Sequence, residues 1–409
     1  MTGRKRARRA LLIVAAAALV LAATAAARTH AQAAKKPIVI GWAYDGSKGG
    51  PMAPFDGPAL AAAEIRKNEI NAKGGVLGRK LVIKTCNTQG DNTTASKACA
   101  DKLISQEHAN VIFTTCDVNL ATPVVQESLK HHLLTIAPCI GTDQMGPKGF
   151  GKAGKLAVSF GNVAQDEGAA MAQLAWKHGW KTADLAKDTT IIYFEAVVNA
   201  FKARFTQLGG KIVASTTYQD PALQPGSTNF NNAATTMEQN KADVIVTVTA
   251  GAYQALGPFL TDLRTAGDNT PVLNSWAGDG TYWLTQNPKV TNYWFVTYAN
   301  AFGHDPNKSV NKLAKQVKAA TGGFVTGPAA IDGLVAAITR AHGSLVGSKL
   351  AAVMQKFHKV PTVSGYVSFS AKLHSVFGRA YRVIEINDNV PIEKGTITAK
   401  VVPNSPDSP

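Results

Sequence analysis

Short apolar segments alternate with amphipathic segments of helical length along most of the chain. Near its beginning, Ile38–Gly41 is an apolar run of the kind that forms a buried parallel strand. The pattern then predicts a helix over Ala59–Ile70. Gly74-Gly75 should end this helix, because glycine accepts the positive φ angles of a helix terminus, and a second strand starts at Leu81. A strand–helix–strand unit of this kind indicates an α/β layered fold.

The same alternation continues in two series, one before and one after residue 160, which indicates parallel sheets with right-handed crossovers. The first series is expected to contain helices over 94–106 and 120–129 and strands over 81–84, 111–114 and 133–136. The second is expected to contain helices over 166–178, 193–208, 230–239 and 254–266 and strands over 182–186, 211–217, 244–249, 272–275 and 294–298. Helices over 309–321, 328–341 and 349–357 and a β-rich segment over 365–386 complete the expected elements.

One segment near the beginning is specific enough to suggest a family. It reads IVIGWAYDGSKGGPMAPFDGPALAAAEIRKNEINAKGGVLGRKL, with a helix ending in Ile-Asn-Ala-x-Gly-Gly and then Gly-Arg-x-Leu. This resembles the opening of type I periplasmic solute-binding proteins of ABC transporters, the leucine/isoleucine/valine-binding family. The resemblance continues more weakly to about residue 390.

The resemblance implies two doubly wound, Rossmann-like lobes joined by three chain crossings, with the ligand between the lobes. The crossings are expected near 157–163, 298–302 and 360–364. Lobe 1 would then consist of residues 37–158 and 302–362, and lobe 2 of residues 162–299 and 363–400. The polar tail 401–409 is expected to be disordered. The family also implies a monomer that delivers its solute to an ABC permease and needs no cofactor or metal.

The N-terminal residues 1–33 have the composition of a secretory signal peptide. Five Lys and Arg residues precede the apolar run Ala10–Ala27, and Ala31-Gln32-Ala33 matches the small-x-small cleavage pattern. An uncleaved membrane anchor is the alternative, because the run approaches the length of a bilayer span. No cysteine precedes Cys86, so we expect an exported protein of the periplasm or cell envelope that is not a lipoprotein.

Charge changes this picture little. The net charge of the 409 residues is +16, but the first 33 carry six Lys and Arg residues and no acid, which leaves +10 on the rest. The remaining basic residues are scattered, and nucleic-acid binding would need them clustered. We therefore expect no nucleic-acid partner.

All four cysteines lie between residues 86 and 139, and an even number in an exported chain indicates disulfides with three possible pairings. Cys86 follows a strand and Cys99 lies on the next helix, while Cys116 and Cys139 each follow a predicted strand. We favour the pairs Cys86–Cys99 and Cys116–Cys139. A zinc site is the alternative, but no Cys-x-x-Cys or suitably spaced histidine pair accompanies the cysteines.

Ligand-binding residues are expected at the carboxyl ends of the strands, where parallel α/β sheets bind ligands. By resemblance to the family, Phe55 matches an aromatic residue of the first loop, and Tyr193 and Tyr253 match aromatic residues of the second lobe. Asp279 matches the acid that binds the ligand ammonium group. Three of these residues have a structural alternative, since Tyr193 and Tyr253 could simply pack and Asp279 could shape a turn.

The carboxylate half of the family site is altered. Asp117 stands where amino-acid binders have a serine, and Gly141 stands where they have a threonine, although Thr142 follows; Cys139 lies beside them. A carboxylate at Asp117 would repel a ligand carboxylate, although Asp117 could also be only a helix cap. With Asp117 and Asp279 facing each other between aromatic walls, the expected ligand is an amine, amide or polyol rather than leucine.

Two other functions remain as alternatives. A branched-chain amino-acid binder could use an altered carboxylate site, and an exported hydrolase could use Asp117 and Asp279 as acid and base. The chain has no G-x-S-x-G, H-E-x-x-H, P-loop or G-x-G-x-x-G motif in the context that those chemistries need. We therefore expect a binding protein and not an enzyme.

Overall fold

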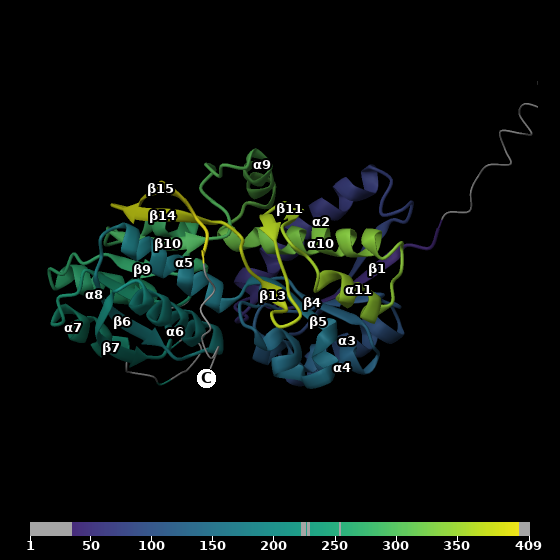
Figure 1. The fold of residues 1–409 in the computed structure, drawn as a ribbon, viewed down its shortest axis with the longest axis horizontal. Coiled ribbons are helices and arrows are strands. Elements are labelled where there is room, and N and C mark those ends of the chain that lie inside the picture. The colour runs from purple at the N-terminus through teal and green to yellow at the C-terminus, as the bar shows by residue number, and fades with distance from the viewer. Residues whose placement is uncertain (1–34, 222–225, 227–229, 253–254, 401–409) are drawn as a thin grey trace, which may run out of the picture.

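The computed structural model describes residues 35–221, 226, 230–252 and 255–400. The predicted signal peptide, the tail 401–409 and Tyr253 lie outside these residues. Two β-sheets with flanking helices form two lobes that lie side by side (Figure 1). This is the α/β, two-lobed architecture that the sequence predicts.

The sheet of lobe 1 has the strand order β2-β1-β3-β4-β5-β13, and all its pairings are parallel. Its strands are β1 (Ile38–Tyr44), β2 (Leu81–Asn87), β3 (Val111–Phe113), β4 (Leu134–Ala137), β5 (Ala157–Asn162) and β13 (Ser375–Val376). The helices of this lobe are α2 (Ala53–Ala72), α3 (Thr93–Ser105), α4 (Val118–Lys130), α10 (Thr326–Arg340) and α11 (Gly347–Met354). Helix α10, with the turn before it, has the length and apolarity of a membrane span, but it is mostly buried against α2 and β5 as a core helix.

The sheet of lobe 2 repeats this order as β7-β6-β8-β9-β10, followed by the antiparallel strands β14 and β15. Its strands are β6 (Thr182–Asp188), β7 (Lys211–Tyr218), β8 (Val244–Thr247), β9 (Val272–Asn274), β10 (Tyr293–Thr297), β14 (Tyr381–Asn387) and β15 (Val390–Ile397). Its helices are α5 (Ala164–Lys177), α6 (Ile192–Gln207), α7 (Phe230–Glu238) and α8 (Leu256–Thr265). Both sheets therefore have the doubly wound 2-1-3-4-5 order, which places ligand sites at the carboxyl ends of the strands.

Helix α2 begins earlier than the pattern predicts, at Ala53 instead of Ala59. It ends at Ala72, two residues beyond the predicted Ile70, and Asn71 in its last turn joins it to the next strand. The Asn71 side chain donates to the carbonyl of Leu81 and accepts from its amide, both at 2.8 Å. Gly75 has a φ of 78°, and a Cβ there would meet the carbonyl oxygen of Arg79 at 2.1 Å. The Asn and Gly of the motif therefore fix the turn from helix to strand.

The third passage between the lobes differs from the expectation. Val360 and Val367, in the hairpin of β11 (Val360–Thr362) and β12 (Gly365–Val367), are buried in the lobe 1 core. The chain then adds β13 beside β5 before it reaches β14 in lobe 2. The predicted crossing near 360–364 was therefore wrong, because two-residue β13 has no readable pattern, and residues 363–376 stay with lobe 1.

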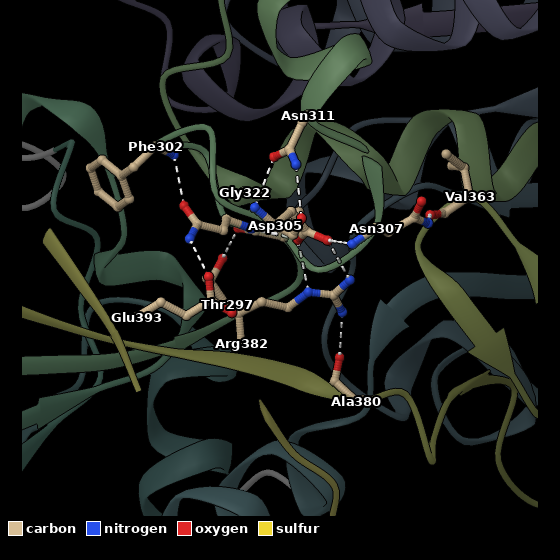
Figure 2. Close-up of polar contacts among 12 residues, drawn as sticks. Thr297, Phe302, Asp305, Asn307, Asn311, Gly322, Val363, Ala380, Arg382 and Glu393 are labelled. Carbon is tan, nitrogen blue, oxygen red and sulfur yellow. Dashed lines mark hydrogen bonds and ion pairs between the residues drawn. The ribbon is translucent and has the colours of Figure 1, made fainter. Parts of the chain in front are cut away.

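A buried ion pair joins the second and third passages (Figure 2). Arg382, on β14, donates from Nε and Nη2 to the Asp305 carboxylate at 2.8 and 2.9 Å. The same carboxylate accepts the backbone amides of Asn300 and Asn307 at 2.9 and 2.8 Å. Two-point pairing of this kind fixes orientation as well as distance. Helix α9 (Lys308–Val317) follows and lies over the junction between the lobes (Figure 1).

Both predicted disulfides, Cys86–Cys99 and Cys116–Cys139, are confirmed. The first joins β2 to α3, and the second joins the loops that follow β3 and β4. The second disulfide thus fixes the relative positions of two loops at the carboxyl edge of the lobe 1 sheet.

Candidate ligand site between the lobes

A small cavity of about 30 Å³ lies where the carboxyl ends of the two sheets meet. Its walls are mostly apolar or aromatic and come from both lobes. Lobe 1 contributes Met52, Phe55, Cys116, Asp117, Cys139 and Gly141. Lobe 2 contributes Ile191, Tyr193, Phe194, Ala250, Trp276 and Ala277. Five residues that the sequence singled out, Phe55, Asp117, Cys139, Gly141 and Tyr193, are therefore brought together here.

Asp117 is the single acid among these lining residues, and no basic side chain lines the cavity in the described part of the chain. Its Oδ1 caps helix α4 by accepting the amides of Asn119 and Leu120 at 2.9 and 3.1 Å. The side chain is buried, and this burial raises the pKa of Asp117, while the backbone hydrogen bonds oppose the rise. The capping alternative is thus correct, and Asp117 is also one of the residues that line the cavity.

The aromatic walls meet across the lobes. The Phe55 ring packs edge-to-face on Trp276 with centroids 5.4 Å apart, and Trp276 stacks on Tyr298 at 4.9 Å. Tyr193 lies 6.3 Å from Trp276 and covers Gly141, where a Cβ would come within 2.5 Å of the tyrosine ring. The glycine at position 141 is therefore required for Tyr193 to occupy its place.

Behind these walls lies Glu167, a residue that the sequence analysis missed. It stands in the first turn of α5 and is completely buried. Its Oε2 accepts from the Tyr193 hydroxyl at 2.8 Å and its Oε1 from the Trp276 amide at 2.9 Å. Burial raises the pKa of Glu167 to about 8. The signal in the sequence was an acidic pair, Asp166-Glu167, at the start of an otherwise apolar helix.

Two predicted site residues do not line the cavity. The Asp279 carboxylate points toward the second passage, where Thr297 and Gly322 donate to its Oδ2. The single turn Trp276–Gly278 after β9 directs Asp279 to that side. The expectation that Asp279 faces Asp117 across the cavity was therefore wrong. Thr142 lies beside β13, where its carbonyl accepts from the Ser375 hydroxyl at 2.7 Å.

Asp56 is the nearest candidate metal ligand in the described residues. Its carboxyl group lies within 4.8 Å of the sulfur atoms of Cys116 and Cys139. Both sulfurs are bonded to each other, so neither is a thiolate that could bind a metal. A single carboxyl group does not make a metal site.

Larger hollows of about 600 and 710 Å³ lie on the outer surface beside α9. None of the predicted site residues that the structure describes lines them. The interlobe cavity is smaller, but it combines the strand ends of both sheets, aromatic walls and a buried acid.

Two doubly wound lobes, three passages and a closed site between the sheets define a two-lobed binding protein. A family model described as periplasmic binding protein matches residues 37–391. The chain belongs to this family.

Known relatives are distant in sequence but similar throughout their length. A Leu/Ile/Val-binding protein, BraC3, from Rhizobium johnstonii is 23% identical over 340 residues, 78% of this chain and 86% of that protein. The isoleucine complex of LivJ from Streptococcus pneumoniae has a TM-score of 0.72 at 18% identity, covering 90% of this chain and 100% of the other. A Rhodopseudomonas palustris solute-binding protein in complex with 4-hydroxybenzoate has a TM-score of 0.72 at 16% identity, covering 90% and 98%. These structures share the fold.

Proposed function

We propose that this protein is the exported, monomeric solute-binding component of an ABC importer. Its solute is a small molecule that carries an amine or amide group on an apolar or aromatic body. The protein would work outside the cytoplasmic membrane and present the closed, loaded form to the permease through the tips of both lobes.

The observation that carries the ligand class is Asp117 at an aromatic cavity that has no basic residue among its described walls. An ammonium group beside this carboxylate would gain charge pairing, and the rings of Phe55, Tyr193 and Trp276 would add cation–π attraction of roughly 0.5–2 kcal/mol. A ligand carboxylate would meet Asp117 without a compensating cation.

The same walls argue against a polyol. Asp117, Tyr193 and Trp276 are the lining residues with polar side-chain atoms; the Tyr193 hydroxyl already donates to Glu167, and the Trp276 indole offers a single N–H donor. A polyol would therefore bury several hydroxyl groups without partners, each at a cost of about 1–3 kcal/mol. Of the ligand classes expected from the sequence, this leaves the amine and the amide.

Opening of the lobes is needed for any such ligand to enter, because a cavity of about 30 Å³ holds little more than one water molecule. We propose that the three passages act as the hinge. Closure would then bury the ligand between Phe55 of lobe 1 and Tyr193 and Trp276 of lobe 2.

The hydrolase alternative lacks the second of its two catalytic carboxyl groups, because Asp279 points away from the cavity that Asp117 lines. General acid–base catalysis needs both groups within reach of one substrate. The altered branched-chain amino-acid site loses support for a different reason, since Asp117 and the Tyr193 ring fill the places of the serine and threonine side chains.

Thermal unfolding of residues 34–409 against amines, amides, amino acids, aromatic acids and polyols tests the proposal. A ligand at 100 times its dissociation constant adds about 2.7 kcal/mol to the free energy of unfolding. Stabilisation by an amine or amide, without product formation, supports the proposal. Stabilisation by leucine or benzoate alone would contradict the ligand class, and turnover would contradict the binding function.

A further inference from the structure

Glu167 connects two walls of the cavity that come from different elements. Tyr193 lies in the first turn of α6, and Trp276 follows β9. The two Glu167 oxygens accept one hydrogen bond from each, at 2.8 and 2.9 Å. No hydrogen bond runs directly from Tyr193 to Trp276 among those of the described residues, so Glu167 is the polar group that both walls share.

The neighbouring glycine brings Glu167 within reach. A Cβ at Gly168 would meet the Phe201 amide nitrogen and the Val197 carbonyl oxygen, each at 2.5 Å. Helices α5 and α6 therefore approach backbone to backbone at this point. The close approach places the start of α5 against the middle of α6, and Tyr193 lies about one turn before Val197 in the same helix.

We infer that Glu167 is a positioning residue of the ligand site, which holds Tyr193 and Trp276 in their binding orientation and couples that orientation to its own protonation. This inference rests on the proposed function of the cavity. Glu167 itself does not line the cavity, so it acts through the two aromatic residues and not by contact with the solute.

Protonation matters because both partners of Glu167 are donors in the observed arrangement. The Trp276 amide can only donate, whereas the Tyr193 hydroxyl can donate or accept. The ionised carboxylate therefore accepts the hydrogen bond of the Tyr193 hydroxyl, which then cannot donate elsewhere. The protonated acid can instead donate to the tyrosine oxygen. The Tyr193 hydroxyl can then donate its own hydrogen bond to Ser275 or into the cavity.

Several other ionisable groups face Glu167 from the elements packed around it. They are Asp166 on α5, Tyr193 on α6, Asp279 after β9, Tyr298 after β10 and Tyr381 on β14. Burial raises the pKa of each tyrosine well above 10, so they stay neutral. Asp166 and Asp279 both have pKa values of about 7, again raised by burial, so both are expected to titrate below Glu167.

The test uses Glu167→Gln, Glu167→Ala and two controls. Glutamine imitates the protonated acid, because its oxygen can accept from Trp276 while its amide donates to Tyr193. Alanine removes both bonds. Asp279→Asn controls for the nearby acid, and Asp184→Asn controls for loss of a buried carboxyl group of the same lobe that bonds Asn240 away from the cavity.

Near-ultraviolet circular dichroism of the unliganded proteins between pH 6 and 10 gives a readout that needs no ligand. We expect a transition near pH 8 in wild type, Asp279→Asn and Asp184→Asn, and its loss in Glu167→Gln. Persistence of that transition in Glu167→Gln would overturn the inference.

Benzylamine provides the second readout. We expect Glu167→Gln to bind it within about threefold of wild type at pH 7 and Glu167→Ala to bind it at least tenfold more weakly, while Asp184→Asn is unchanged. Equal affinity of Glu167→Ala and wild type would overturn the inference. Failure of wild type to bind benzylamine would count against the proposed ligand class, and the circular dichroism would still decide the role of Glu167.

Discussion

The ring of Tyr193 in lobe 2 rests on the backbone of Gly141 in lobe 1, at a distance that leaves no room for a Cβ atom. This contact joins the loop after β4 to the start of α6 and closes one side of the ligand cavity. The tyrosine ring fills the space that a side chain at position 141 would need.

Gly141→Ala is therefore expected to displace Tyr193 and to disturb closure. The new Cβ would lie 2.5 Å from a ring carbon, and overpacking of this kind costs about 1–3 kcal/mol. Urea unfolding and benzylamine titration should both show the loss. The matched control is Gly57→Ala on α2, where a Cβ would meet nothing within 4 Å. Equal effects of the two substitutions would contradict the role of this contact.

The two roles of Asp117 can be separated by stability measurements. Asn is as good a helix cap as Asp, whereas Ala loses the bonds to Asn119 and Leu120. Asp117→Ala should therefore lower the free energy of unfolding by about 1 kcal/mol, and Asp117→Asn should change it little. Denaturation of both variants in urea checks this. A large loss in Asp117→Asn would show that the cap depends on the charge.

Stability should fall as the pH rises toward 8. Burial raises the pKa of Asp166 and Asp279 to about 7 and that of Glu167 to about 8, so the folded state favours their protonated forms. This stabilisation is complete below the unfolded pKa values near 4 and is lost as the pH passes the folded values. We expect the free energy of unfolding to fall by about 2 kcal/mol or more between pH 5.5 and 8.5.

Urea unfolding at these two pH values tests the direction. Asp279→Asn should make the fall smaller, because it removes one of the three groups. Higher stability at pH 8.5 than at pH 5.5 would mean that these acids are ionised in the folded protein.

The ion pair between Asp305 and Arg382 should be essential to the fold around the passages (Figure 2). Asp305→Ala leaves a buried guanidinium without its partner, which costs about 3–5 kcal/mol. The surface pair of Lys289 and Asp388 is the control, since both side chains are more than half exposed. Asp388→Ala should cost less than about 1 kcal/mol. Similar melting temperatures for the two variants would contradict the assignment.

The two disulfides should differ in their effect on binding. Cys116–Cys139 lines the cavity and closes a loop of 23 residues, whereas Cys86–Cys99 lies outside the lining. Replacing both Cys116 and Cys139 by serine should lower stability by about 3 kcal/mol and also weaken ligand binding. The corresponding Cys86 and Cys99 variant should lose stability alone. Unchanged affinity in the first variant would show that the disulfide does not shape the site.

Local patterns in the sequence predicted most of the helices and strands, and the family resemblance added five of the residues that line the cavity. Asn71 and Gly75 predict a turn whose hydrogen bonds join residues within ten positions of each other. Cys116 and Cys139 follow strands that are adjacent in the sheet. Glu167 and Asp279 could not be placed in this way. Their roles depend on the approach of α5 to α6 and on the direction of one short turn after β9, neither of which leaves a periodic signal.

Calorimetric titration with benzylamine and benzoate measures whether the cavity prefers a cation, because the two probes share a ring and differ in the sign of their charge. We expect wild type to bind benzylamine and not benzoate, and Asp117→Asn to weaken benzylamine binding at least tenfold while the protein stays folded. Tight binding of benzoate, or equal binding of benzylamine by wild type and Asp117→Asn, would contradict the proposed ligand class.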